Sequence, residues 1–384
     1  MKLRLVSFAG WCAATVLTLV AASASAAQSY VAVPLGTLGG IGSNGVGINI
    51  GGQMTGFSNP SGSALFHAYR FSGSTMVDLG TLGGSQSMGW AINSSGQVAG
   101  DSYLAGDSTQ HAFLFSNGTM IDLGTLPGGS QSSARGINAS GQVVGNATPN
   151  GSVATHAFLY SGGAMSDLAT FGGASSNAAG INDAGQVTGG AQTVAGAFHA
   201  FLYSGGSMLD MGTLGGSNSQ GIAINSNGQV TGLADTSGGS SHAFLYSGSA
   251  MADLGALPGA SSSAGFGINN AGQVVGLAEF PNQTLPRAFL YTEGAMYDLN
   301  SLVVSGLGGM TLTIADDIND SGQIAATGCN GAGTTCLAFR LDPTANPGNA
   351  LPVPTLSGWA LFMTTTLIVI GVAGVRRARR YTSH

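Results

Sequence analysis

The chain repeats one short phrase seven times. Each copy reads Ile-Asn-x-x-Gly-Gln, and the glutamines of successive copies stand 44, 45, 44, 43, 44 and 50 residues apart. A repeat of this length cannot bury its apolar side chains alone, so the copies must pack against one another in a propeller or a solenoid. The copies begin at Ile48, Ile92, Ile137, Ile181, Ile224, Ile268 and Ile318.

Two further phrases recur with the same spacing along the chain. One reads His-Ala-aromatic in the first five copies, and arginine and then leucine replace its histidine in the last two. The other reads Asp-Leu-Gly or a close variant. The first phrase starts at His67, His111, His156, His199, His242, Arg287 and Leu337, and the second at Asp78, Asp122, Asp167, Asp210, Asp253 and Asp298.

Each unit predicts four short strands. Gly-Ile-Asn is typical of a strand that ends in a tight turn, where the asparagine bonds forward to the backbone and the glycine supplies a left-handed residue. Gln-Val-x-Gly predicts the second strand, His-Ala-Phe-Leu-Tyr the third and Met-x-Asp-Leu-Gly the fourth. Four strands in about 44 residues predict an all-β fold, a seven-bladed β-propeller, with an open solenoid as the competing layout.

The two ends of the repeat array favour a closed ring. Residues 30–40 read as the tail of a repeat that lacks its first three strands, and residues 337–341 read as a third strand without a fourth. A propeller closes when one end supplies the strand that the other lacks, because this exchange hides both sheet edges. A linear solenoid would instead need capping units, which the sequence does not display.

Both termini carry export signals. Residues 1–26 predict a secretory signal peptide, with two basic residues, an apolar run and a small-residue cleavage site, and a retained transmembrane helix is the alternative. Residues 358–375 are apolar and long enough for one transmembrane helix, with a buried core helix as the alternative. The basic tail that follows should stay in the cytoplasm and place the array outside. That tail contains Arg376, Arg377, Arg379 and Arg380.

The segment before the apolar stretch resembles a known sorting signal. Its residues, the apolar stretch and the basic tail together resemble the IPTL-type C-terminal signal of Gram-negative bacteria, which is similar to the PEP-CTERM tails that exosortase-type transpeptidases handle. Val353 replaces the usual isoleucine and Gly358 the usual glutamate, which leaves the efficiency of processing open. The resemblance implies an exosortase-type partner, an inner-membrane anchor before processing, and then a cell-surface or extracellular location. The motif comprises Val353, Pro354, Thr355, Leu356, Ser357 and Trp359.

The three repeated phrases resemble the HAF repeat of extracellular bacterial proteins over residues 34–341. The resemblance implies a secreted or surface protein and brings no established activity. The expected organisation is a signal peptide at 1–26, a propeller at 27–342, a linker at 343–352 and the sorting signal at 353–384.

The repeat array is acidic and contains one cysteine pair. Between residues 28 and 349 four arginines stand against all sixteen acidic residues, so 4 − 16 gives a formal charge of −12. Phosphate backbones require a basic surface, which excludes nucleic acid as a partner. Cys329 and Cys336 predict a disulfide outside the cytoplasm, and a zinc site would need two more ligands.

The repeated histidines and aspartates could suggest a metal or catalytic site. Their recurrence in blade after blade favours contacts that maintain the fold, with each histidine bonding a turn within its own blade. Asp316, Asp317 and Asp320 form the densest acidic cluster, a weak calcium candidate. Glu279 and Glu293 are too irregularly placed to predict a glycosidase pair. The sequence therefore predicts no catalytic residue, cofactor or metal site.

Function is expected where the copies differ, with tolerated surface drift as the alternative. The sequence predicts a non-enzymatic, exported cell-surface or extracellular-matrix protein, adhesive or polymer-binding, which contacts a polysaccharide or another surface polymer. The alternative is a glycan-active hydrolase or lyase with its pocket in the central channel. The variable segments are residues 303–310, the loop between the two cysteines, and residues 101–110 and 234–241.

Overall fold

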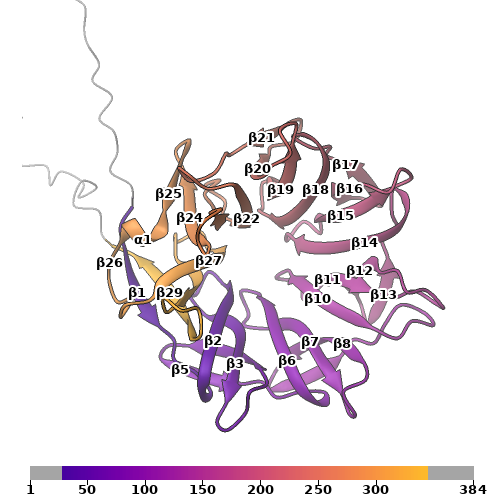
Figure 1. Ribbon diagram of the computed structural model, residues 1–384. Coiled ribbons are helices and arrows are strands. Elements are labelled where there is room, and N and C mark those ends of the chain that lie inside the picture. Colours follow the sequence, from indigo (N-terminus) through magenta and orange to yellow (C-terminus); the bar gives the residue numbers. More distant parts are fainter. Residues whose placement is uncertain (1–27, 345–384) are drawn as a thin grey trace, which may run out of the picture.

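Seven sheets of mainly antiparallel strands form a ring in the computed structural model, which describes residues 28–344 (Figure 1). The predicted all-β, seven-bladed propeller is confirmed, and the ring excludes the open solenoid. The signal peptide at 1–26, most of the linker, the sorting motif and the apolar stretch at 358–375 lie outside the described residues. Within 28–344 no helix is long and apolar enough to cross a bilayer.

The first four blades each contain four strands in sequence order. Blade one has β2 (Gly39–Ile48), β3 (Met54–Pro60), β4 (His67–Ser72) and β5 (Thr75–Asp78). Blade two has β6 (Gly83–Ile92), β7 (Val98–Leu104), β8 (Gln110–Ser116) and β9 (Thr119–Asp122). Blade three has β10 (Ser132–Ile137), β11 (Val143–Ala147), β12 (His156–Ser161) and β13 (Ala164–Asp167). Blade four has β14 (Gly172–Ile181), β15 (Val187–Thr193), β16 (Phe198–Ser204) and β17 (Ser207–Asp210).

Blades five and six keep this plan, and blade seven departs from it. Blade five has β18 (Gly215–Ile224), β19 (Val230–Thr236), β20 (Ser241–Tyr246) and β21 (Met251–Asp253). Blade six has β22 (Ser262–Ile268), β23 (Val274–Glu279), β24 (Arg287–Thr292) and β25 (Ala295–Asp298), followed by the four-residue helix α1 (Leu299–Leu302). Blade seven has β27 (Thr311–Ile318), β28 (Ile324–Cys329) and β29 (Cys336–Pro343), and also β1 (Tyr30–Pro34) and β26 (Val303–Ser305).

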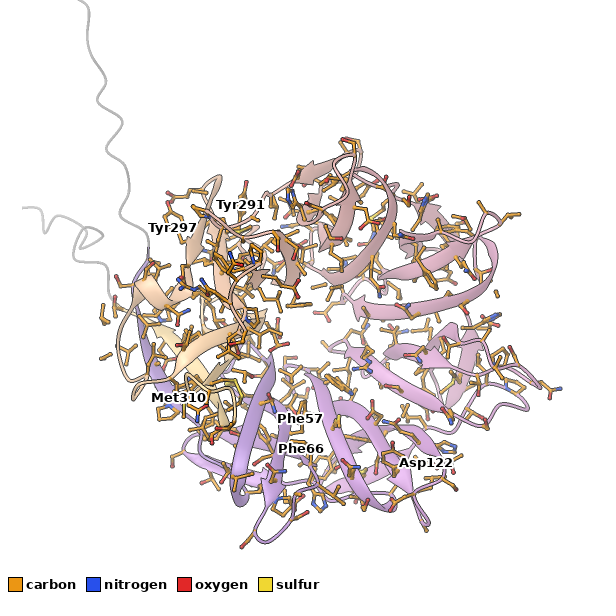
Figure 2. All side chains as sticks on the ribbon, viewed as in Figure 1. Phe57, Phe66, Asp122, Tyr291, Tyr297 and Met310 are labelled. Carbon is orange, nitrogen blue, oxygen red and sulfur yellow. A yellow bond between two sulfur atoms is a disulfide. The ribbon has the colours of Figure 1, made fainter. Side chains whose placement is uncertain are left out.

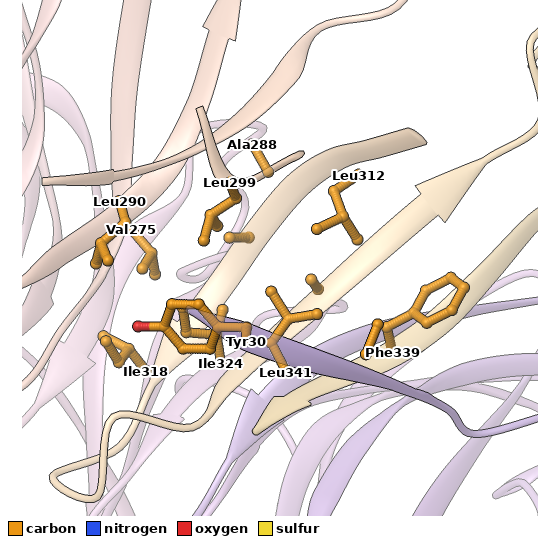
Figure 3. Close-up of a cluster of buried hydrophobic side chains, with 13 residues drawn as sticks. Tyr30, Val275, Ala288, Leu290, Leu299, Leu312, Ile318, Ile324, Phe339 and Leu341 are labelled. Carbon is orange, nitrogen blue, oxygen red and sulfur yellow. The ribbon is translucent and has the colours of Figure 1, made fainter. Parts of the chain in front are cut away.

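The N-terminal strand closes the ring. β1 pairs antiparallel with β29, with Tyr30 opposite Pro343, and so supplies the fourth strand of blade seven, as the two incomplete ends predict. Tyr30 is fully buried in the cluster that joins blade seven to blade six (Figure 3). β26 then pairs parallel with β1 as a fifth strand. Part of the insertion at residues 303–310, which the sequence suggests as contact surface, therefore covers the closing strand.

The inner strands are longer than the Gly-Ile-Asn phrase predicts. In four blades the first strand has ten residues and starts at a Gly-Gly pair. Gly39 has φ of 99°, a backbone conformation that side chains disfavour. A side chain at Gly40 would overlap the backbone of Asn59. The glycine pair therefore turns the chain into the inner strand rather than separating two blades.

The repeated aromatic residue forms the core of each blade. In blade two Phe113 is fully buried, and a Cβ added to Gly100 on the neighbouring strand would stand 2.7 Å from its ring. The same Cβ would overlap the carbonyl oxygen of Met88 on the inner strand, so this backbone oxygen and the ring together require the glycine. The equivalent buried aromatics are Tyr69, Phe113, Phe158, Phe201, Phe244, Phe289 and Phe339.

A serine joins each of six blade pairs. The hydroxyl of Ser87 accepts a hydrogen bond from Ala68 N of the preceding blade at 2.9 Å and donates one to Gly80 O at 2.6 Å. Between blades six and seven the amide of Asn300 replaces it, bonding both Leu312 N and Leu312 O. The serines are Ser43, Ser87, Ser132, Ser176, Ser219 and Ser263.

The repeated asparagines form a closed ring of hydrogen bonds. The side chain of Asn49 accepts from Gln53 N at 3.0 Å, which makes the predicted turn, and its Nδ2 donates to the carbonyl of Asn93 in the next blade at 2.9 Å. Every blade repeats the second bond, and the last one returns to the first blade. The ring runs through Asn49, Asn93, Asn138, Asn182, Asn225, Asn269 and Asn319.

Candidate binding site in the central channel

Each inner strand carries a β-bulge near its end. In blade one Gly45 pairs with Gly56 and Gly47 pairs with Thr55, so Val46 between them has no partner. A bulge re-aims a side chain out of the regular ladder and is frequent beside functional sites. The seven bulged residues are Val46, Trp90, Arg135, Ala179, Ile222, Phe266 and Asp316.

All seven bulged residues line one cavity of about 650 Å³ along the axis of the ring. No two of them are the same residue type, whereas the isoleucine and asparagine that follow are identical in every blade. The repeat thus keeps its frame and varies the side chain that it presents to the channel. Apart from Asp316, these residues were not predicted as site residues, although each stands three residues before a repeated asparagine.

Trp90 and Arg135 form a stacked pair on the channel wall. The guanidinium carbon of Arg135 lies 4.0 Å from the centre of the Trp90 ring, a cation–π contact. The indole Nε1 of Trp90 donates to Asp101 Oδ2 at 2.7 Å, and Asp101 also accepts from Gln110 and Ser133. Asp101 is 2% exposed and held by these three hydrogen bonds, so its bond to the indole nitrogen fixes the orientation of Trp90.

An aromatic strip extends from this pair toward the loops of blade one. The ring of Phe57 lies 5.7 Å from that of Trp90 and 5.2 Å from that of Phe66. Figure 2 labels Phe57 and Phe66 on blade one. Of these aromatic residues only Trp90 lines the cavity, and amides supply another part of its wall, where Gln220 Nε2 donates to Asn177 Oδ1 at 2.6 Å. The channel therefore combines apolar faces with groups that can bond hydroxyls.

Two carboxyl groups from blade seven also border the channel. Asp317 accepts hydrogen bonds from Ile48 N at 3.0 Å and Ile318 N at 2.9 Å, which ties blade seven to blade one. The carboxyl of Asp316 has no hydrogen bond to any residue in 28–344. Burial raises the pKa of Asp317 to about 6, and burial together with the charge of Asp317 raises the pKa of Asp316 well above its usual range.

The structure divides the acidic cluster that the sequence suggested for calcium. Asp320 lies on the turn side of the ring, where its carboxylate accepts bonds from the backbone and side-chain nitrogens of Asn270 at 2.8 and 2.6 Å. Asp320 borders a separate cavity of about 200 Å³. In the described part of the chain no three His, Cys, Asp or Glu side chains gather as a group that could hold a metal ion.

The repeated histidines pair with the repeated aspartates inside each blade. Nδ1 of His67 lies 2.9 Å from Asp78 Oδ2, and the aspartate also accepts from Gly80 N at 2.8 Å. The other four pairs have distances of 2.7–2.9 Å, all eleven residues apart. The sequence analysis did not predict these partners, and this constant spacing is the signal that could have shown them. The further pairs are His111–Asp122, His156–Asp167, His199–Asp210 and His242–Asp253.

The last two blades depart from this pairing: blade six replaces one partner and blade seven replaces both. In blade six Arg287 replaces the histidine and lies 3.0 Å from Asp298. In blade seven Leu337 stands at the histidine position, and the register places Pro34 at the aspartate position. Blade seven thus lacks both the histidine and the aspartate, which indicates that the two residues serve each other as a contact within one blade.

The remaining predicted positions lie on the strands and loops around the ring. A disulfide joins Cys329 and Cys336, which face each other across β28 and β29. The segment 101–110 starts and ends in strands, and so does 234–241, so only the turns between those strands are loops.

No protein-family model matches the chain, and no curated protein matches it. Several solved structures resemble it. A puromycin-hydrolyzing peptidase of Mycobacterium tuberculosis is 11% identical with a TM-score of 0.50, covering 82% of this chain and 56% of the peptidase. A structure from work on two prolyl endopeptidases is 9% identical with a TM-score of 0.52, covering 83% of this chain and 51% of that one. The chain thus spans about half the length of both, and the likeness shows the propeller fold alone.

Proposed function

We propose that this chain is a non-enzymatic propeller, displayed at the cell surface or in the extracellular matrix, that binds a surface polymer in its central channel. One observation carries the proposal: seven different side chains occupy equivalent bulges around one cavity, on a frame that is otherwise repeated. A ring built only for stability has no need of such variety. Recognition needs it, because a ligand is distinguished by unlike groups placed around it.

The channel wall favours binding over hydrolysis. A glycosidase needs two free carboxyl groups on either side of the scissile bond. Asp317 uses its carboxylate on two backbone N–H groups, and Asp101 bonds three side chains. Among the acidic groups of 28–344 around the channel, this leaves Asp316 as the carboxyl that a substrate could meet. The raised pKa of Asp316 is the observation that favours the alternative, a glycan-active enzyme.

Export and sorting rest on the terminal segments of the sequence. The proposed signal peptide at 1–26 and the sorting motif at 353–359 lie outside the described residues. Replacement of Pro354 and Thr355 by alanine should hold the chain in the inner membrane if a transpeptidase recognises the motif. Unchanged release from the membrane would contradict the sorting proposal and leave the binding proposal untouched.

Binding is tested with a panel of neutral and acidic polysaccharides and the purified full chain. A variant carries alanine at Trp90, Arg135, Phe266 and Asp316, the residue that blade four already has at this position. Affinity electrophoresis should show retention of the parent by at least one polymer and loss of that retention in the variant.

A matched control carries alanine at four exposed apolar positions outside the channel and should bind as the parent does. Its positions are Val77, Ile121, Val153 and Leu209. Equal retention of the channel variant would overturn the proposed site. Release of sugar fragments by the parent chain, lost on Asp316→Asn, would establish the enzymatic alternative instead.

A further inference from the structure

Arg135 differs from the other arginines of the described chain. Arg287 and Arg340 make ion pairs with Asp298 and Asp342, and Arg70 donates to Gly96 O at 3.2 Å. The guanidinium of Arg135 makes no hydrogen bond or ion pair with any residue in 28–344. All five of its N–H donors are therefore available to a ligand.

The position of Arg135 is nevertheless fixed. Its planar group lies over the face of Trp90, and the three donors that converge on Asp101 hold that indole in place. A stacked guanidinium keeps its edge free, and the edge is the part that bonds a carboxylate through two parallel N–H groups. The loss of conformational freedom on binding is correspondingly small.

The surroundings narrow the class of anion. The cavity of about 650 Å³ falls in the range of small-ligand pockets and exceeds what a bare ion needs. Asn177 and Gln220 can bond hydroxyls, and the ring of Phe266 offers an apolar surface for the C–H face of a sugar. Asp316 and Asp317 border the same cavity and disfavour a dianion such as phosphate.

We propose that the channel binds the carboxylate of an acidic sugar, a hexuronic acid residue of a polysaccharide, with Arg135 stacked on Trp90 as its anchor. This inference rests on the proposed function and names the ligand class of the same site. The carboxylate takes the free edge of the guanidinium, and the ring hydroxyls bond the amides of the wall.

Fluorescence of Trp90 tests the proposal directly. In the full chain with Trp11 and Trp359 replaced by phenylalanine, Trp90 is the one tryptophan that remains. Sodium glucuronate should change its emission in a saturable way, and glucose at equal concentration should not. Arg135→Gln should weaken the apparent affinity roughly tenfold or more, the usual effect of losing hydrogen bonds to a charged group. Arg135→Lys should retain part of the affinity for glucuronate, since lysine keeps the positive charge but lacks the two parallel N–H donors of the guanidinium.

Arg70→Gln is the matched control, because it removes an arginine outside the channel wall and should leave glucuronate binding unchanged. Equal responses to glucose and glucuronate, or an unchanged affinity in Arg135→Gln, would overturn the inference. So would inorganic phosphate binding as tightly as glucuronate. If the chain is retained by polymers and Arg135→Gln does not alter that retention, the ligand class is wrong and the proposed function stands. If no polymer retains the parent chain, the proposed function itself fails.

Discussion

The side-chain amide of Asn319 donates a hydrogen bond to the carbonyl oxygen of Asn49 at 2.9 Å, across 270 residues of chain. This bond is the seventh of the asparagine ring and the one that joins the last blade to the first. Both asparagines are almost fully buried, 6% and 5% exposed, so an unmade bond there would leave a polar group without water. The same side chain that shapes each turn therefore also connects neighbouring blades.

Alanine replacements in the ring should separate these two roles. Asn138→Ala and Asn319→Ala remove equivalent bonds, and each should lower the free energy of unfolding by about 1–3 kcal/mol. Only Asn319→Ala weakens the contact between the last blade and the first, so hydrogen exchange of β1 should accelerate in that variant. Equal exchange rates of β1 in the two variants would contradict a special role for the closing bond.

Tyr30 should show what the closing strand contributes. Its ring is fully buried in the cluster with Leu299 and Leu312, and its hydroxyl has no hydrogen-bond partner among residues 28–344. Tyr30→Ala should cost about 3–5 kcal/mol of stability. Tyr30→Phe removes only the unsatisfied hydroxyl and should be neutral or stabilising by about 1 kcal/mol. Urea denaturation measures both, and a Tyr30→Phe variant as unstable as Tyr30→Ala would contradict this packing.

The histidine–aspartate pairs should prove unequal when each partner is removed. His111→Ala loses one partly exposed hydrogen bond and should cost less than about 1 kcal/mol. Asp122→Ala also frees Gly124 N, which its carboxylate bonds at 2.8 Å, and should cost about 1 kcal/mol more. Denaturation of both single variants and the double variant gives the coupling between them. A larger cost for His111→Ala than for Asp122→Ala would show that the aspartate does not anchor the turn.

Asp316 and Asp317 should make the fold less stable as pH rises. Their pKa values are raised in the folded chain, so the folded state holds protons that the unfolded state has released. Stability from these groups is complete below about pH 4 and is lost as pH increases through the folded pKa, about 6 for Asp317. That shift corresponds to on the order of 3 kcal/mol.

Asp316→Asn should therefore raise the Tm at pH 8 and flatten its fall between pH 4 and 8. Asp107→Asn removes one negative charge from an exposed turn and serves as the control. A Tm of Asp316→Asn that follows the parent at every pH would show that Asp316 titrates without a penalty for burial.

The repeat made the blade count and the closure predictable, because both depend on spacing along the chain. Asn49 and Gly52 predict the turn that they form, and the His-Ala-aromatic phrase predicts the third strand. Closure followed from the spare strand at residue 30 and the strand missing after residue 341.

The channel was not predictable in the same way. A bulge depends on how two strands pair, and Trp90 has no partner only because Gly89 and Ala91 pair with consecutive residues of β7. From the sequence alone, variation at one position of a repeat resembles neutral substitution on the surface. The strand pairing is needed to show that all seven variable residues face one cavity. The stacking of Arg135 on Trp90 likewise joins two blades, and local sequence patterns carry no signal for it.

Thiol labelling at Ala179 shows whether the bulge residues form the binding site. A full chain with Cys12→Ser and Ala179→Cys places one reactive thiol in the channel, and Val153→Cys in the same background places one on the exposed surface. Added oligogalacturonate should slow maleimide labelling of the Ala179→Cys thiol and leave that of the Val153→Cys thiol unchanged. Equal labelling rates at position 179 with and without the saccharide, while the chain still binds it, would place the binding site outside the channel.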